Sequence, residues 1–183
     1  MNKSPAASDD LDRALVRRCL DGEWAAGNEL ADRYYRSVYT VSLRILGNVQ
    51  DAEDVTQTVF GNVFAALPHY DPRYRFFSWI YRMTVNESLN TLKRRKQVIS
   101  LDGSFDVPAP SGVSESAIEA ENRVGRGLLE LKPDDRAVVV LRHFVSFSYE
   151  EISDVLGVPV KTVKSRLFTA RERLREALLA ASK

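Results

Sequence analysis

The chain has a single cysteine, Cys19, and only two histidines, His69 and His143. One cysteine excludes an intrachain disulfide and a zinc site built from cysteines. No Ser/His/Asp set, metal-ligand spacing or phosphate-binding loop is present either. We expect His143, which lies in an apolar helical pattern, to sit beside the core. The sequence therefore argues against an enzyme, and we expect no catalytic residue, no metal and no cofactor.

Long hydrophobic runs are also missing. No apolar stretch approaches the roughly 20 residues that a membrane-spanning helix needs. The N-terminus, MNKSPAASDDLDRA, lacks the apolar centre of a secretory signal. We therefore expect no membrane insertion and a location in the reducing cytoplasm.

Charge of either sign is nearly balanced overall, at a net +1, but it is unevenly distributed. Residues 73–96 contain seven Lys/Arg and one acid, and residues 161–175 contain six Lys/Arg and one acid. Residues 97–116, between these blocks, contain three acids and no base. Each basic block is suited to phosphate contacts, although two solvated helix faces would give the same counts.

Helical periodicity dominates what is present, and no segment offers a convincing strand pair. The run Val138–Leu141 has β propensity, but it is short and has no partner, so we expect it to be helical. The predicted fold class is all-α, with two small helical domains joined by a flexible acidic linker, the second containing a helix-turn-helix. The expected helices are Leu11–Leu20, Ala25–Leu46, Asp51–Leu67, Phe76–Arg95, Ile118–Leu131, Asp134–Val145, Ser148–Leu156 and Val160–Ala180.

The domain boundaries follow from a change in composition. The stretch ISLDGSFDVPAPSGVSESA is rich in serine, glycine and proline, and it has no base. Such a segment buries little apolar surface and is typical of a linker. We therefore divide the chain into a first domain at 1–96, a linker at 97–116 and a second domain at 117–183.

The segment SYEEISDVLGVPVKTVKSRL predicts a helix-turn-helix. Ser148 and Glu151 have the spacing of a capping box that opens the first helix. Gly157 suits a sharp turn with positive φ, and Pro159 restricts φ just before the second helix. A helical hairpin that binds no DNA would share some of these features.

One face of the second helix is apolar, and its other face carries candidates for base contact. A helix of this kind fits the DNA major groove, with its early residues at the base edges. Arg171, Arg173 and Arg175 lie further along and suit phosphate or solvent. The outward-facing candidates are Lys161, Lys164, Ser165, Phe168 and Thr169.

Aromatic and basic residues interleave in HYDPRYRFFSWIYRMTVNESLNTLKRRK, a mixture that suits single-stranded nucleic acid. Four apolar residues at helical spacing, Phe76, Trp79, Ile80 and Met83, are expected to be mostly core. The candidates for DNA contact are Tyr70, Arg73, Tyr74 and Arg75 in the loop, and Arg82, Asn86 and Lys93 on another face of the helix.

The helix that begins DAEDVTQTVF has an acidic first turn. Such a start is favourable for the helix dipole by itself. Asp54 and Gln57 also leave a polar surface on one face, which could dock a protein partner. Both readings remain open from the residues alone.

Taken together, three blocks carry a family resemblance: DAEDVTQTVFGNVF, then RFFSWIYRMTVNESLNTLKRRK, then SYEEISDVLGVPVKTVKSRLFTARERLRE. In this order and separation they resemble bacterial RNA polymerase sigma factors of the extracytoplasmic function (ECF) group. The likeness runs from about Leu11 to Leu179. The first domain then corresponds to sigma region 2 and the second domain to sigma region 4.

The resemblance implies two partners, core RNA polymerase and promoter DNA. The helix with Asp51, Glu53, Asp54 and Gln57 is expected to bind the clamp helices of the β′ subunit, and region 4 the β flap. The loop 68–76 and the next helix, with Asn86, are expected to capture single-stranded DNA of the −10 element. By analogy, an anti-sigma factor is the expected regulator. The residues implied in reading the −35 element as duplex are Lys161, Thr162, Lys164, Ser165, Phe168 and Thr169.

The chain departs from the family pattern at two of these positions. Many members have glycine where this chain has Lys161 and a basic residue where it has Thr169, so we expect an unusual −35 preference. Because the net charge is near zero, we also expect the isolated chain to bind promoter DNA weakly. The competing reading is a two-domain helix-turn-helix transcriptional regulator that acts without replacing the sigma subunit.

Overall fold

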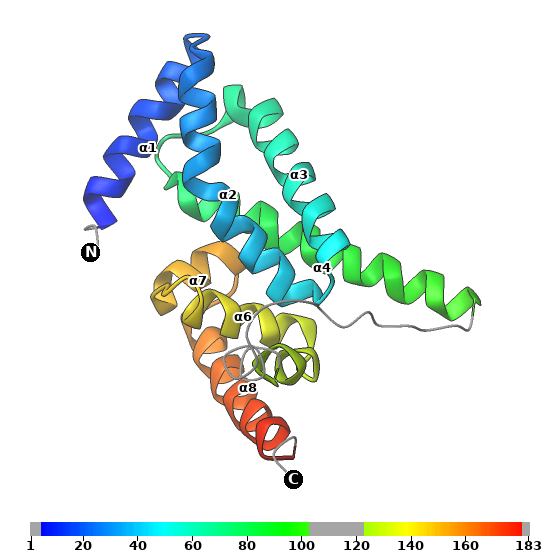
Figure 1. Ribbon diagram of the computed structural model, residues 1–183. Helices are drawn as coiled ribbons and strands as arrows, with labels where there is room; N and C mark the ends of the chain where they lie inside the picture. The colour runs from blue at the N-terminus through cyan, green and yellow to red at the C-terminus, as the bar shows by residue number, and fades with distance from the viewer. Residues whose placement is uncertain (1–4, 103–122, 181–183) are drawn as a thin grey trace.

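The computed structural model describes residues 5–102 and 123–180, and within these ranges the regular structure is entirely helical. Figure 1 shows a group of N-terminal helices lying against a group of C-terminal helices. The predicted all-α fold with two helical domains is confirmed. Residues 103–122 lie outside the described ranges, so only residues 97–102 of the predicted linker are described. No helix in the described ranges has the length and apolar character needed to cross a membrane.

The N-terminal group is a bundle around α2 and α4. Its core is formed by apolar positions that recur on one face of each helix. Val38 and Ile45 of α2, Val59 of α3 and Ile80 of α4 have no exposed surface. The helices of this group are α1 (Pro5–Leu20), α2 (Trp24–Leu46), α3 (Val49–Ala66) and α4 (Phe76–Asp102), with a short 3-10 helix η1 (Leu67–His69) after α3.

The junction between α2 and α3 is set by two residues. Gly47 ends α2 in the left-handed region, at φ 69°, and its N–H donates to the Leu43 carbonyl. Asn48 then caps α3, because its side chain accepts a hydrogen bond from the backbone N–H of Asp51 at 2.9 Å. The expected helix end at Leu46 is therefore present, and Gly47 and Asn48 each set one helix end.

Helix α4 is longer than the sequence pattern predicted. It continues to Asp102 rather than ending near Arg95, and so enters the segment assigned to the linker. Residues 96–102 contain no proline or glycine, and Gly103 is the first residue that favours a break. The rest of the predicted linker, 103–116, lies outside the described residues.

A buried carboxylate joins α1 to α2. The Asp12 side chain is 1% exposed, and its Oδ1 lies 2.7 Å from Nε of Arg33. The Tyr34 hydroxyl donates to its other oxygen, Oδ2. Burial raises the pKa of Asp12 above its ordinary value of 3.8, although the contacts with Tyr34 and Arg33 act in the opposite direction. This network holds α1 on the bundle.

Replacing Asp12 with alanine is expected to lower the free energy of unfolding by about 2–4 kcal/mol, since the change removes the acceptor of a buried hydroxyl and one member of a largely buried ion pair. Urea unfolding followed by circular dichroism measures the loss. The exposed neighbour Asp10 gives the matched control, because Asp10→Ala removes a carboxylate from the same helix. Equal stability of the two variants would contradict a structural role for the network.

The same network makes a pH prediction. A carboxyl group whose pKa is higher in the folded chain binds its proton more tightly there than in the unfolded chain. Its contribution to stability is therefore fully present below pH 3.8 and declines as the pH rises toward the folded pKa. The stability difference between the wild-type chain and Asp12→Ala should thus widen as the pH is lowered from neutral.

The C-terminal group packs around α6, whose run Val138–Leu141 is buried and helical, as expected. Burial on all sides explains the β-like composition, because a helix covered by α7, α8 and the N-terminal bundle needs no polar face there. The segments of this group are residues 123–129, which are helical, α6 (Pro133–His143), α7 (Tyr149–Leu156) and α8 (Val160–Ala180).

The two groups of helices contact each other directly. Helix α7 packs on α4, and α6 packs on both α2 and α4. Figure 1 shows α6 and α7 lying below the C-terminal half of α2 and the first half of α4. This contact brings the predicted helix-turn-helix against the basic, aromatic half of the chain.

Candidate functional site

Of the four residues of α3 that were predicted to bind polymerase, one pairs with another helix and three are exposed. Asp51 lies 2.9 Å from Nη1 of Arg95 and so ties α3 to α4. Glu53, Asp54 and Gln57 are exposed on the outer side of the helix. Asp54 accepts a long hydrogen bond, 3.4 Å, from the side chain of Gln50 on the same helix. Three of the four predicted polymerase-binding residues are thus open to a partner.

An aromatic stripe continues this outer face of α3, and the sequence pattern did not single it out. Phe60 and Phe64 follow Glu53 and Gln57 at helical spacing. The ring of Tyr35, from α2, stacks on Phe60 with centroids 5.9 Å apart, and Phe60 lies 6.3 Å from Phe64. Tyr35 and Phe64 are both exposed. Exposed aromatic residues beside polar ones are typical of protein interfaces.

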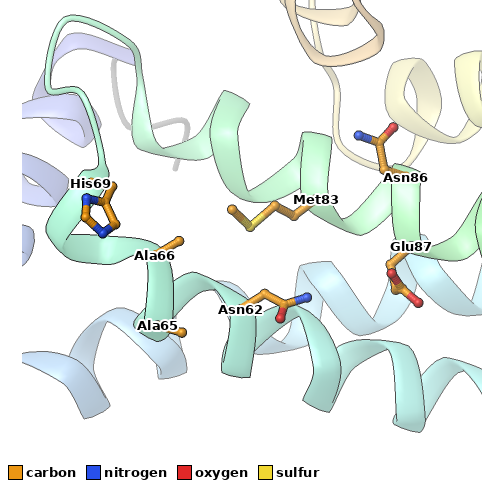
Figure 2. A pocket seen from close by; sticks show the side chains of 7 residues that line it. All are labelled: Asn62, Ala65, Ala66, His69, Met83, Asn86 and Glu87. Carbon is orange, nitrogen blue, oxygen red and sulfur yellow. The ribbon is translucent and has the colours of Figure 1, made fainter.

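A pocket of about 530 Å³ lies between the end of α3 and the middle of α4. This volume is in the usual range for small-molecule sites. Figure 2 shows the residues of α3 and η1 along one side and those of α4 along the other. The lining residues are Asn62, Ala65, Ala66, His69, Met83, Asn86 and Glu87.

Only Asn86 among these pocket residues was a predicted contact. Its side chain is exposed, as is that of Asn62 on α3, and each amide can donate and accept hydrogen bonds. In Figure 2 the Asn86 amide points away from α3. Glu87 adds a carboxylate that is paired with Nη2 of Arg94 at 2.7 Å. Ala65 and Ala66, just before Pro68, could have indicated this pocket in the sequence, because their small side chains leave space between the helices. Met83 also lines the pocket. It was expected to be mostly core, and its side chain is half-buried.

The loop before α4 has one internal aromatic residue and one exposed one. The ring of Tyr70 packs 5.1 Å from Trp79 and 5.7 Å from Phe76, and burial raises its pKa to about 12. Tyr74 is 67% exposed and its ring is available for stacking. Arg73 is exposed and forms an ion pair with Asp71 at 2.6 Å.

The remaining candidates on this surface face different ways. Arg75 bridges α1 and α7, because its Nε lies 2.9 Å from Asp9 and its Nη1 lies 3.2 Å from Glu151. Arg82 donates to the Asp154 carbonyl of α7. Lys93 is exposed, further along α4. The structure therefore groups Asn86 with the pocket, Arg73 and Tyr74 with the open loop, and Arg75 and Arg82 with the contact to α7.

The helix-turn-helix has the local geometry predicted for it. Ser148 Oγ accepts from the N–H of Glu151 at 3.1 Å, and the Ser148 N–H donates to Oε2 of Glu151 at 2.8 Å. Gly157 has φ 64°, and the Ser153 hydroxyl closes the turn by donating to the Val158 carbonyl at 2.6 Å. These bonds set the direction in which α8 leaves the turn.

The predicted reading face of α8 is open. Phe168 is 71% exposed, and the ammonium of Lys164 lies 5.7 Å from the centre of the Tyr149 ring. Thr162 is half-buried at the start of the helix. The opposite face, including Val163, Leu167 and Ala170, is buried on α6 and α7. The remaining candidates, Lys161, Ser165 and Thr169, are exposed with Lys164 and Phe168.

A basic cluster lies beyond the reading face. Nη2 of Arg171 is 3.4 Å from Nε2 of His143, at the end of α6. Partial burial, followed by the charges of Arg171 and Arg142, lowers the pKa of His143 below its ordinary value. A neutral imidazole at neutral pH lets the two arginines approach without a third positive charge.

Comparison with known proteins gives matches along both halves of the chain. The sigma-70 region 2 family matches residues 30–98, and the family described as sigma-70, region 4 matches residues 121–174. The RNA polymerase sigma-H factor of Pseudomonas aeruginosa is 31% identical, over 92% of this chain and 94% of its own length. The ECF RNA polymerase sigma-E factor of Escherichia coli K12 is 32% identical, over 89% of this chain and 92% of its own.

Two solved structures have the same fold. CnrH in complex with the cytosolic domain of CnrY matches with a TM-score of 0.73 and 26% identity, over 94% of this chain and 99% of that one. The sigma factor RpoE of Bartonella quintana, solved with the anti-sigma factor NepR, also has a TM-score of 0.73, at 22% identity over 82% of this chain and 95% of that one. The chain belongs to the ECF family of RNA polymerase sigma factors.

Proposed function

We propose that this sigma factor engages core RNA polymerase and promoter DNA through three separate surfaces, and that it has no chemistry of its own. As a family member the chain directs core polymerase to promoters and promotes DNA opening and initiation. The proposal assigns the surfaces to residues: α3 to polymerase, the α3–α4 pocket and its loop to the −10 strand, and α8 to the −35 duplex. Its place of action is the cytoplasm.

The division into domains is part of the proposal. Residues 1–96 act as the region 2 domain, 97–116 as the linker, and 117–183 as the region 4 domain. The two family matches support this division, because they leave a gap between residue 98 and residue 121. Because α4 continues to Asp102, the fourteen remaining linker residues, 103–116, reach at most about 48 Å, which is enough to bridge one turn of DNA.

The polymerase surface is supported by exposure and charge. Glu53, Asp54 and Gln57 lie on the outer side of α3, and none of them forms an ion pair within the described residues. The stripe of Tyr35, Phe60 and Phe64 extends the same face with aromatic area. A partner with basic and apolar side chains, as expected for the β′ clamp helices, fits this surface. Region 4 would contact the β flap, and an anti-sigma factor would compete with these partners.

The pocket between α3 and α4 gives the strongest support to the proposal, because it offers a site for an unstacked base. It lies beside a loop with exposed Tyr74 and Arg73, on a basic helix, and is lined by amides that can pair with the edge of a base. An unstacked base in such a pocket, with its backbone along cationic side chains, is the usual form of single-strand recognition. We assign this pocket to a base of the non-template −10 strand.

The −35 surface makes a prediction about specificity. Lys164→Ala on the exposed face of α8 should relax base preference at one position of the upstream element by about 1–3 kcal/mol. Holoenzyme binding to duplexes with each single-base change measures this preference. Arg175→Ala, a later exposed residue on the same helix, is the control, and should weaken binding to all duplexes alike. If the Lys164 variant distinguishes the single-base changes as well as the wild-type chain does, Lys164 does not read a base of the −35 element.

A transcription experiment tests the proposal as a whole. The chain is mixed with core polymerase and a library of DNA fragments, and the transcripts are sequenced. Starts that share two upstream elements support the proposal. If the polymerase is neither bound nor redirected, the proposal fails. A two-domain regulator acting beside another sigma subunit would instead bind duplex DNA without core polymerase. The upstream half is helical over the residues that the structure describes, without the strands of an α/β receiver domain.

A further inference from the structure

Arg75 lies at a helix position where a positive charge is unfavourable. Its carbonyl accepts a hydrogen bond from the N–H of Trp79 at 3.2 Å, so Arg75 is the N-cap residue of α4. Helices favour Ser, Thr, Asp or Asn at this position and negative charge around it, because their first N–H groups have no partner within the helix. An arginine here therefore lowers the stability of the helix start unless an acid lies beside it.

Helix α1 supplies this acid. Oδ2 of Asp9 lies 2.9 Å from Nε of Arg75. The Asp9 side chain is 13% exposed, and its other oxygen, Oδ1, is buried and accepts no hydrogen bond from the described residues. The sequence pattern placed the start of this helix at Leu11, but α1 begins at Pro5 and so includes Asp9. A largely buried carboxylate attracts a neighbouring cation more strongly than a fully solvated one does.

The rest of α1 fixes the position of Asp9. Asp12, one turn later on the same face, binds Arg33 and Tyr34 of α2 in a buried network. Leu15, a further turn along, has no exposed surface. Consecutive turns of α1 are thus attached to the N-terminal bundle, so the Asp9 carboxylate is held on a rigid element.

The loop before α4 lies alongside α1. Figure 1 shows the segment between α3 and α4 passing beside this helix, and α1 contacts both η1 and α4. The Tyr70 hydroxyl donates to the Tyr74 carbonyl and closes the loop. Beyond burial, which raises the Tyr70 pKa, the next influences on this pKa are the charges of three α1 residues, Arg13, Asp9 and Asp12. Both ends of the loop, Tyr70 and Arg75, therefore face α1.

The contact with Asp9 uses the inner nitrogen of the guanidinium. Nε is bound, whereas Nη1 and Nη2 lie at the far end of an Arg75 side chain that is 42% exposed. Nη1 is the atom that faces Glu151 of α7, so the contact with Asp9 is separate from that one and lies within the N-terminal group of helices. A guanidinium that is held at one nitrogen by a carboxylate presents its remaining N–H groups in a fixed direction, which suits a phosphate oxygen.

We propose that Asp9 is a positioning residue for reading the −10 strand, and that it orients the Arg75 guanidinium so that the Nη groups meet a phosphate of the single strand. This inference rests on the proposed assignment of Arg75 to the −10 surface, which is the α3–α4 pocket and its loop. It adds α1 to that surface, although the region 2 family match begins only at residue 30. It also accounts for an arginine at the N-cap of α4, because the charge is unfavourable for the helix but available to DNA.

A double-mutant cycle between Asp9 and Arg75 tests the proposal in the holoenzyme. Arg75→Ala removes the phosphate contact and should slow promoter opening about tenfold. Asp9→Asn keeps the size of the side chain but removes the charge that holds Arg75, and it should slow opening about two- to fivefold. In the Arg75→Ala background, Asp9→Asn should add no further loss, because no guanidinium is left to orient.

Two further variants separate positioning from a general effect of charge. Asp9→Glu keeps the carboxylate and should open promoters nearly as fast as the wild-type chain. Asp10→Asn removes a carboxylate from the same turn of α1, at an exposed position, and should have no effect. Opening is followed by the fluorescence of a 2-aminopurine base in the −10 element of a promoter that the transcription experiment identifies. The affinity for core polymerase, measured in parallel, should be the same for all these variants.

The salt dependence of DNA binding gives a second readout, which a purely structural role of Asp9 would not change. A phosphate contact releases counterions, so the loss of one lowers the slope of log affinity against log salt by about 0.7 for a single strand. With holoenzyme and a single-stranded −10 oligonucleotide, Asp9→Asn should lower this slope as Arg75→Ala does, although it makes the chain more positive. Tighter binding with a steeper slope would overturn the proposal, because Asp9 would then neutralise Arg75 and not orient it.

The outcomes separate this inference from the proposed function. If Asp9→Asn slows opening equally with and without Arg75, Asp9 only supports the fold, and its positioning role is overturned. If Arg75→Ala opens promoters normally, the inference fails together with the assignment of Arg75, whereas the assignment of the pocket is unaffected. In both cases the chain still redirects core polymerase. If it does not, the proposed function itself fails.

Discussion

Replacing Asp54 with arginine is expected to lower the affinity of the chain for core RNA polymerase by about 30-fold or more, the effect typical of an interface hot spot. The carboxylate is exposed on the outer side of α3 and its only described bond is the long one from Gln50. Charge reversal therefore opposes a basic partner without disturbing the packing of the helix. Gln57→Ala, one turn further on the same face, should weaken binding in the same direction.

Controls distinguish binding from stability. Asp10→Arg makes the same charge change at an exposed position of α1 and should leave polymerase affinity unchanged. Asp51→Asn should act differently, because Asp51 pairs with Arg95 and holds α3 against α4. Competition for core polymerase measures affinity, and thermal unfolding measures the fold. If Asp54→Arg binds as tightly as the wild-type chain, the polymerase surface lies elsewhere.

Loss of the pocket between α3 and α4 is expected to have the second large effect. Asn86→Ala removes an amide that can pair with a base edge, and a well-placed pair of this kind is worth about 1–3 kcal/mol. Promoter opening by the holoenzyme should therefore fall about tenfold, at unchanged affinity for core polymerase. Ala65→Trp should have a larger effect, because the indole fills the space that the small side chain leaves.

Asn90 offers the matched control for the pocket. It lies one turn after Asn86 on α4, is exposed, and does not line the pocket. Asn90→Ala should open promoters like the wild-type chain. Opening is followed by the fluorescence of a 2-aminopurine base placed in the −10 element. If Asn86→Ala and Ala65→Trp both open promoters normally, a base does not occupy this pocket.

The helices were predictable because their ends carry local chemistry. The capping box of Ser148 and Glu151, the left-handed Gly47 and the turn at Gly157 each act within a few residues. The reading face of α8 was predictable for the same reason, since helical spacing alone separates Val163 and Leu167 from the exposed Lys164. The end of α4 was misjudged, because a loss of apolar periodicity does not stop a helix where no proline or glycine follows.

The polymerase and promoter surfaces were predictable only in part. Asp54 and Gln57 are exposed as expected, whereas Asp51 is engaged by a residue 44 positions away along the chain. Tyr70 was grouped with the DNA contacts, and its ring packs internally on Trp79. Each of these differences comes from a partner on another helix, which spacing within one helix does not reveal. Whether these residues contact polymerase or DNA stays a prediction.

By itself the sequence determined the all-α class, most helix boundaries and the outward face of the recognition helix, because these depend on caps, turns and periodicity within a segment. Only the tertiary structure decided that small residues on α3 open a pocket toward Asn86. The same is true of the contacts that hold Arg75 between α1 and α7, direct Arg82 toward α7 and bury Arg136 at the end of α2. The physical reason is that an apolar stripe specifies which face of a helix is buried, while the relative position of two packed helices specifies which polar groups then meet.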